Sequence, residues 1–287
     1  MPVNDDLGIR MKTYYEQIPK TKLMRRTPVA IRLDGKAFHT FTRGFQRPFD
    51  EVLVKTMQDT MKYLCENIQG CVLGYTQSDE ITLILCDYQT LDTAAWFDYE
   101  VQKMCSVSAS MATMAFNKAF EKNIHNTPSV SPIQANKYIA ALEKGAMFDS
   151  RVFNIPKEEV TNLLYWRQID ARRNSIQMVG QAYFSHKELH EKNLNMIQDM
   201  LFTQFGVNWN DCPTHLKRGS CCVKSQTKTT WSKSYEDGTV ETGVAERPHW
   251  YIDKEIPMFK GEGREYIESR IHFGDENTLR PSYIFIN

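Results

Sequence analysis

The chain contains 287 residues, of which 41% are hydrophobic and 24% are charged, and these are the proportions of an ordinary globular protein. Its 35 lysine and arginine residues balance its 35 aspartate and glutamate residues. This balance excludes a uniformly basic surface, so a nucleic acid would have to bind local basic patches. The seven cysteines include no CxxC pair, which indicates reduced thiols and argues against a zinc site.

Nothing in the sequence indicates export or membrane insertion. Residues 1–16 are polar and lack the apolar core of a signal peptide. No apolar run approaches the ~20 residues that are needed to cross a bilayer. We therefore expect a soluble, cytoplasmic protein.

The N-terminal part predicts a helical arm followed by a strand. Within this arm, residues 5–26 are predicted to be helical and end in a basic cluster that includes Arg25 and Arg26. These two arginines are either part of a solvated surface or contacts for phosphate. Apolar residues then alternate over residues 27–34, which predicts a strand that Gly35 ends.

Helical and extended patterns alternate along the next part of the chain. A helix with one apolar face follows Asp50, a suitable N-cap, and reaches Ile68. Residues 71–87 read as a β-hairpin with a polar tip. A long helix is predicted over residues 92–122, a polar loop over 125–135, a strand within 147–156 and a further helix over 157–184.

The order β-α-β-β-α-β predicts an α+β, ferredoxin-like fold with an antiparallel four-stranded sheet and two long helices on one face. In that arrangement the first and third strands are neighbours, so Asp34 and Asp79 should meet at one end of the sheet. Beyond Ser185 we expect a helix over residues 188–205, a strand over 217–224 and a turn at 236–239. The predicted division is an arm (1–26), a catalytic domain (27–185) and a mixed C-terminal region (186–287).

Two carboxylates on neighbouring strands can hold divalent metal ions. Mg²⁺ prefers oxygen ligands and usually takes one or two carboxylates together with phosphate oxygens. Asp34, the Gly35 carbonyl and Asp79 would supply such ligands, and the backbone amides of residues 36–39 could hold a triphosphate. An Asp-Gly turn after a strand and a solvated hairpin tip are also common without any metal ion. The spacing alone therefore leaves open both a metal site and two ordinary surface turns.

Five short motifs together resemble the tRNA-His guanylyltransferase family. They are IRLDG (31–35), FHTF (38–41), GYTQSDE (74–80), FDSR (148–151) and YWRQID (165–170). They occur in the order and at spacings similar to those of the family, across roughly residues 25 to 185.

The resemblance implies a palm-like catalytic domain that adds nucleotides to the 5′ end of tRNA, the reverse of the usual direction. It implies that ATP first adenylylates the tRNA 5′-phosphate and that the 3′-hydroxyl of GTP then attacks it. Two Mg²⁺ ions assist the transfer, and members of the family are typically tetrameric.

The family's functional positions fall on particular residues here. The resemblance implies that Asp34 and Asp79 are catalytic and that they bind the metal ions together with Gly35. It also implies the following nucleotide-binding set: Asp34, Gly35, Lys36, Ala37, Phe38, His39, Ser78, Asp79 and Lys103.

Residues 171–175 depart from the family pattern. The sequence there is ARRNS, where eukaryotic members carry a His-Ile-Asn-Asn run. The segments 208–211 and 217–220 look more like the bacterial and archaeal-type branch, whose members repair truncated tRNA 5′ ends against a template. We therefore expect template-directed repair, with strict addition of G−1 to tRNA-His as the alternative. The predicted tRNA contacts are Arg25, Arg26, Arg172, Arg173, Lys217 and Arg218.

Two other functions remain open from the sequence. A palm-fold nucleotidyl cyclase would use the same metal ions without tRNA. A ferredoxin-like sheet can also be a non-catalytic RNA-binding module. His186 and His190 are spaced as in zinc helices, but the segment matches neither HExxH nor HxxEH, so we do not expect zinc there.

Overall fold

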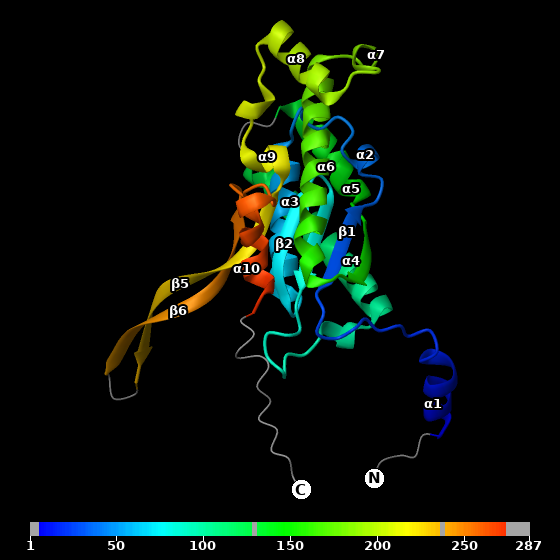
Figure 1. The fold of residues 1–287 in the computed structure, drawn as a ribbon, viewed down its shortest axis with the longest axis vertical. Helices are drawn as coiled ribbons and strands as arrows, with labels where there is room; N and C mark the ends of the chain where they lie inside the picture. Colours follow the sequence, from blue (N-terminus) through cyan, green and yellow to red (C-terminus); the bar gives the residue numbers. More distant parts are fainter. Residues whose placement is uncertain (1–5, 128–130, 236–238, 274–287) are drawn as a thin grey trace.

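A single antiparallel sheet organises the computed structural model, which describes residues 6–127, 131–235 and 239–273 (Figure 1). Its six strands lie in the order β4-β1-β3-β2-β5-β6, and every neighbouring pair is antiparallel. The strands are β1 (Val29–Gly35), β2 (Cys71–Gln77), β3 (Glu80–Leu85), β4 (Phe148–Asn154), β5 (Ser220–Ser234) and β6 (Val240–Asp253).

The predicted ferredoxin-like core is confirmed. Helix α3 (Glu51–Asn67) connects β1 to β2, and α4 (Val101–Asn126) precedes β4. As predicted, β1 and β3 are neighbours at the centre of the four core strands, and Asp34 lies opposite Glu80 in their register. The side chain of Asp50 accepts a hydrogen bond from the Leu53 amide at 2.9 Å and so caps α3, also as predicted.

Both faces of the sheet are covered by helices. Helices α3 and α4 bury the β1 side chains Val29, Ile31 and Leu33 on one face, as the sequence predicts. The opposite face, with Ala30 and Ile84, packs against α6 (Lys157–Tyr183) and α10 (Glu265–Ile271). The sequence pattern does not predict this second layer of helices, because the buried positions of α6 include polar residues that interrupt its apolar periodicity.

Several predicted boundaries are wrong. The helix expected over residues 5–26 is shorter, since α1 (Asp6–Met11) and the short π-helix η1 (Lys12–Glu16) end the helical part. The helix expected from residue 92 starts only at Val101, after the 3₁₀ turn η2 (Trp96–Tyr99). The loop expected over 125–135 overlaps the start of α5 (Pro132–Lys144), which Ser131 caps and where proline occupies the first turn.

The C-terminal region joins the same sheet. Here α7 (His186–Leu189) and α8 (Leu194–Phe205) replace the one helix expected over residues 188–205. The 3₁₀ turn η3 (Trp209–Asp211) and α9 (Thr214–Arg218) lead to β5, which starts later than predicted and is much longer. Strand β5 pairs with β2 only from Ser220 to Val223 but with β6 along its length, so the β5–β6 ribbon projects away from the sheet (Figure 1). Residues 236–238 of the predicted turn lie outside the described residues.

In the part of the chain that the structure describes, no helix is both long and apolar enough to cross a membrane. The remaining short elements are α2 (Phe38–Phe41), directly after β1, and η4 (Gly261–Arg264), directly before α10.

Candidate active site

The end of β1 and the β2–β3 turn bring the two predicted aspartates together. The Gly35 amide donates a hydrogen bond to the Asp79 carbonyl at 3.1 Å, so residues 34 and 79 are held side by side. Ser78 adopts a positive φ of 50° in this turn, and its hydroxyl donates to the Asp79 carboxylate at 3.0 Å. The strand order therefore produces the predicted meeting of the carboxylates.

The charge of Asp79 is unfavourable in this position. Burial raises the pKa of Asp79, and the neighbouring Asp34 raises it further, while the Ser78 hydroxyl lowers it. Neither aspartate forms an ion pair with a lysine or arginine within residues 6–127, 131–235 and 239–273. This uncompensated negative charge is what a bound cation would neutralise.

The donor set fits Mg²⁺ rather than zinc. In the described residues no group of three or more His, Cys, Asp or Glu side chains could hold a metal ion. Two carboxylates and the Gly35 carbonyl would leave the remaining positions to water and phosphate oxygens, which is the usual coordination of Mg²⁺ in nucleotide sites.

The loop after β1 is shaped by close packing. A Cβ atom on Gly35 would overlap the Phe38 ring, so only glycine fits there. Phe38 is buried against Phe41 and Phe148, with ring centroids 5.1 and 5.2 Å away. Ala37 adopts a left-handed conformation with φ 55°. The amides of residues 37–39 have no backbone acceptor in the described part of the chain, so they are available to a bound anion.

These residues open onto a cavity of about 650 Å³. Six residues of the predicted site line it: Gly35, Ala37, Phe38, His39, Ser78 and Asp79. Asp34 does not line it but directly precedes Gly35. The rest of the lining comes from residues 42–48, Asp50 and Leu53 and from Met178 and Gln181 of α6. The sequence pattern does not reveal the two α6 residues, because they are more than 90 residues away from Asp79 along the chain.

A buried ion-pair cluster next to the aspartates is a second feature that the sequence pattern does not predict. Arg167 of α6 contacts Glu80 (Nε–Oε1, 2.8 Å) and Asp170 (2.6 Å), and Arg32 of β1 contacts the second Glu80 oxygen at 3.3 Å. Burial raises the pKa of Glu80, while Arg167 and Arg32 oppose that rise. The available signal was the motif YWRQID together with Arg32, which shares its face of β1 with Asp34.

Two lysines of the predicted nucleotide site lie apart from the cavity. Lys36 is exposed, and its amide donates to the Met147 carbonyl at 2.9 Å. Lys103 is exposed near the start of α4, with its ammonium 4.9 Å from the centre of the Phe97 ring. The nearby Val101 amide donates to Thr21, which precedes β1, so Lys103 lies toward the opposite end of the sheet from Asp34.

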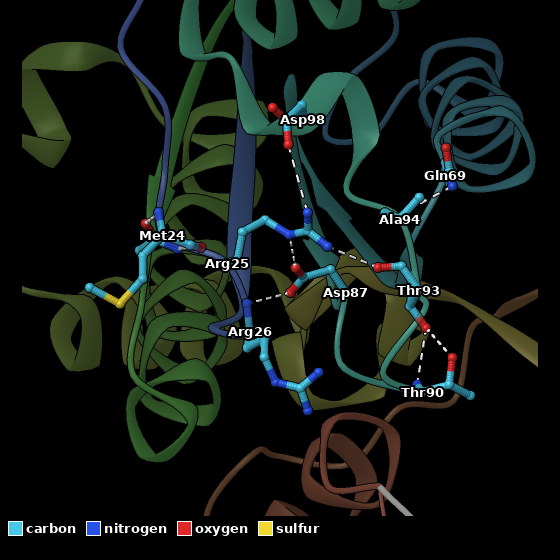
Figure 2. Close-up of polar contacts among 10 residues, drawn as sticks. Met24, Arg25, Arg26, Gln69, Asp87, Thr90, Thr93, Ala94 and Asp98 are labelled. Carbon is cyan, nitrogen blue, oxygen red and sulfur yellow. Dashed lines mark hydrogen bonds and ion pairs between the residues drawn. The ribbon is translucent and has the colours of Figure 1, made fainter. Parts of the chain in front are cut away.

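Arg25 and Arg26 also lie at that opposite end, where they contact the buried Asp87 (Figure 2). Arg25 Nε is 2.5 Å from the Asp87 carboxylate, and its guanidinium also donates to the Thr93 carbonyl at 3.0 Å. The Arg26 amide donates to Asp87 at 2.8 Å, while its side chain points away from that carboxylate. Asp98 lies on the far side of Arg25, at 3.7 Å.

The other four predicted tRNA contacts gather around α6 and α9. Arg172 and Lys217 approach the buried Trp209 ring at 5.8 and 5.6 Å. Arg173 is exposed and lies 4.0 Å from Asp170, while the backbone carbonyl of Arg218 accepts a hydrogen bond from Tyr75. The packing of α9 against α6 thus brings two pairs of basic residues, far apart in the sequence, onto neighbouring elements.

A ferredoxin-like sheet that carries two carboxylates, an amide-lined loop and an open cavity at one end defines a palm-like nucleotidyltransferase. Residues 9–156 match the family model for tRNAHis guanylyltransferase. Because that match covers just over half of the chain, the protein belongs to the tRNAHis guanylyltransferase family, and it is a nucleotidyltransferase of that family.

Solved structures and a curated relative agree with this assignment. A bacterial tRNA(His) guanylyltransferase (Thg1)-like protein in complex with ATP is 38% identical, with a TM-score of 0.75 over 93% of this chain and 99% of that one. The same kind of protein in complex with GTP is 37% identical, with a TM-score of 0.72 over 93% and 100%. The tRNA(His) guanylyltransferase of Schizosaccharomyces pombe is 25% identical over 234 residues, which cover 76% of this chain and 80% of the relative.

Proposed function

We propose that this protein adds nucleotides to the 5′ end of tRNA in the 3′–5′ direction, guided by the opposite strand. The observation that carries the proposal is the pairing of Asp79 with Asp34 and Gly35 at the mouth of the 650 Å³ cavity. The ATP and GTP complexes of the similar bacterial proteins support a nucleoside triphosphate as its ligand.

The loop residues would bind the triphosphate. The free amides of residues 37–39 supply donors, and His39 and Ser78 line the same cavity. Asp34, the Gly35 carbonyl and Asp79 would hold two Mg²⁺ ions, which when bound supply charge neutralisation and polarise the phosphoryl oxygens. The family resemblance also assigns Lys36 and Lys103 to this proposed nucleotide site, but neither lines the cavity, and Lys103 lies toward the opposite end of the sheet from Asp34.

The transfer takes two balanced steps. In the first, an oxygen of the tRNA 5′-monophosphate attacks the α-phosphorus of ATP, and pyrophosphate leaves with the electron pair of the broken bond. In the second, the 3′-hydroxyl oxygen of GTP attacks the tRNA 5′-phosphorus, its proton passes to water, and AMP leaves. The protein's contribution is to position the reactants and stabilise the transferring charge.

Two observations favour template-directed repair over strict addition of G−1. Identity is higher to the bacterial Thg1-like structures than to the S. pombe guanylyltransferase. Residues 171–175 read ARRNS at the position where eukaryotic members carry a His-Ile-Asn-Asn run. Arg172, Arg173, Lys217 and Arg218 are the proposed tRNA contacts of this surface, and Arg25 and Arg26 those at the opposite end.

One assay tests the proposal. The protein is incubated with Mg²⁺, ATP and each labelled nucleoside triphosphate in turn, on tRNAs that lack their first nucleotide and differ at the opposite position. We expect addition of the complementary nucleotide in each case. Addition of G regardless of the opposite base would favour strict G−1 activity, a cyclic nucleotide product would favour a cyclase, and binding without turnover would favour an RNA-binding module.

We further infer, from the family resemblance, a homotetramer in the cytoplasm. Light scattering coupled to size-exclusion chromatography tests the assembly, and cell fractionation tests the location. We also assign residues 186–287 to tRNA binding, and their exposed β5–β6 ribbon supports that role.

A further inference from the structure

A second cavity of about 500 Å³ adjoins the first. Arg47 and Gln181 line both cavities, so the two are adjacent. Most of its lining comes from the C-terminal part of α6 and from residues 184–192, called the α7 segment below. Figure 1 shows that these elements lie beyond the end of the sheet. No part of the predicted site accounts for it.

The rim of this cavity is rich in hydrogen-bond donors without partners. The side chains of Arg47, Lys192, Gln177 and Gln181 have no hydrogen-bond or ion-pair partner in the parts of the chain that the structure describes. His186 and His190 add two imidazole rings, with centroids 6.5 Å apart. Such a set of donors fits a ligand that carries anionic oxygen atoms.

Of the two carboxylates in the α7 segment, Glu188 and Glu191, only Glu191 lines the cavity. Glu188 accepts hydrogen bonds from the Ser185 amide (2.8 Å) and hydroxyl (2.7 Å) in a capping box, and it does not line the cavity. Glu191 does line the cavity and lies 3.8 Å from His190. Arg47 and Lys192 therefore face one carboxylate, which leaves a formal surplus of one positive charge.

That surplus distinguishes between the two phosphate ligands at hand. The surplus of one positive charge matches the single negative charge of a phosphodiester in an RNA strand, whereas a free triphosphate carries several negative charges, most of which would stay uncompensated. The floor of the cavity is apolar, with Phe184 and Ile197 buried and Leu189 half-buried. A base or ribose can pack on such a floor, whereas an inorganic anion would gain nothing from it.

We propose that the second cavity binds the nucleotide residue of the RNA strand that adjoins the reacting 5′ end. Its phosphodiester lies against Arg47 and Lys192, and its base or ribose packs on Phe184 and Leu189. This inference rests on the proposed function, since it takes the first cavity as the place of reaction. It gives the α7 segment a role in setting the RNA strand on the enzyme.

A matched pair of lysines provides the test. Lys187→Ala and Lys192→Ala each remove one exposed positive charge from the same segment, but only Lys192 lines the cavity. The measurements are fluorescence anisotropy with a 3′-labelled, 5′-phosphorylated acceptor-stem duplex at several salt concentrations, and calorimetric titration with ATP in the absence of RNA.

We expect Lys192→Ala to weaken duplex binding on the order of tenfold and to reduce the salt slope by about one. Lys187→Ala should stay within about twofold of the unmodified protein, and ATP binding should be unchanged in both. Gln177→Lys adds a cation to the rim and should tighten duplex binding, so the test does not depend on losses alone.

Equal effects of the two lysine variants on the duplex would overturn the proposal. A loss of ATP binding with intact duplex binding in Lys192→Ala would also overturn it, since the occupant would then be a free nucleotide. Failure of the proposed function is a separate outcome, namely no 5′ addition by the unmodified protein even though Lys192→Ala selectively loses the duplex.

Discussion

At the scale of single residues, Asp79 is destabilising until a cation is bound. A pKa raised above its usual range means that the ionised form is less favourable in the folded chain than in the unfolded chain. At neutral pH the ionised carboxylate therefore lowers the free energy of unfolding. Its value must lie in chemistry, since the packing would accept a neutral side chain at least as well.

The first prediction concerns the removal of the negative charge of Asp79. Asp79→Asn should lower nucleotide addition by about 10³-fold, because metal-assisted stabilisation is worth several kcal/mol. The melting temperature without Mg²⁺ should stay equal or rise, and the increase on adding Mg²⁺ with ATP should disappear. Initial rates and thermal melts measure both, with Asp92→Asn as an exposed control. Substantial Mg²⁺-dependent activity in Asp79→Asn would contradict the metal assignment.

The second prediction concerns Gly35. Gly35→Ala inserts a Cβ into the Phe38 ring, and overpacking of this kind costs about 1–3 kcal/mol of unfolding free energy. Displacement of the loop should also weaken ATP binding. Gly206→Ala is the matched control: it has φ +66° and open space around it, so it should cost about 1 kcal/mol and leave ATP binding intact. Equal ATP affinities in the two variants, measured by calorimetry, would show that the loop tolerates a side chain.

The third prediction separates Arg25 from Arg26, which the sequence presents as one basic cluster. Arg25→Gln leaves the buried Asp87 without its charged partner, and because Arg25 is half-exposed we expect a loss of only about 1 kcal/mol. Arg26→Gln keeps its amide bond to Asp87 and should leave stability unchanged, so any effect should fall on tRNA binding. Urea denaturation and filter binding measure the two effects, and an equal loss of stability would contradict this division.

At the scale of elements, α6 connects the site to the sheet. It packs on β3 through Arg167 and Glu80 and lines the cavity through Met178 and Gln181. A buried ion pair of this kind need not add net stability, but breaking it leaves a charge without compensation.

The fourth prediction is a double-mutant cycle across that pair. Arg167→Met alone should lower the free energy of unfolding by about 2–3 kcal/mol, because the buried Glu80 keeps only Arg32, at 3.3 Å, as a charged partner. Adding Glu80→Gln should recover part of that loss, which gives a coupling energy of about 1–3 kcal/mol. Chemical denaturation measures the four corners of the cycle. Additive losses would show that the contact does not couple α6 to β3.

The elements that were predictable from the sequence have local signals. Asp50, a suitable N-cap, predicts the start of α3, and the alternation of apolar residues over 27–34 predicts β1. Strand order then places Asp34 beside Asp79. The start of helix α5 is not predicted from the sequence because Pro132 lies in a polar segment typical of a loop, although proline suits the first helical turn.

The remaining parts depend on long-range packing that no local pattern encodes. The buried face of α6 includes Arg167, Gln168 and Ser175, so its periodicity is weak. The outer half of the β5–β6 ribbon is exposed on both faces, so it shows no apolar alternation. The contribution of Met178 and Gln181 to the cavity depends on where α6 packs, which no local sequence pattern indicates.

At the scale of the whole molecule, the sheet is buried on both faces while the β5–β6 ribbon extends beyond it (Figure 1). Of the ribbon, Cys221 to Val223 belong to the core, but the strand residues beyond Lys224 whose burial is described are exposed or only half-buried. The ribbon therefore contributes little to the stability of the core and is available for contact with another molecule.

The fifth prediction concerns a variant that lacks the outer part of the β5–β6 ribbon. Replacing residues 227–247 by an Asn-Gly turn between Gln226 and Pro248, which face each other in the ladder, preserves the inner part of the hairpin. The free energy of unfolding should change by less than about 1 kcal/mol, and ATP binding should be retained, while tRNA binding weakens. Denaturation, calorimetry and filter binding test the three parts. Unchanged tRNA affinity would remove the ribbon from the proposed RNA surface.

Helix α6 also limits where residues can be inserted into or deleted from this protein. Arg167 and Met178 are 11 residues apart, which is close to three full turns, so both project from the same side of the helix. Inserting or deleting one residue between them would rotate the cavity wall by about 100° relative to the ion pair. Relatives should therefore differ in length at the tip of the β5–β6 ribbon, and they should keep an invariant count of residues between these two positions of α6.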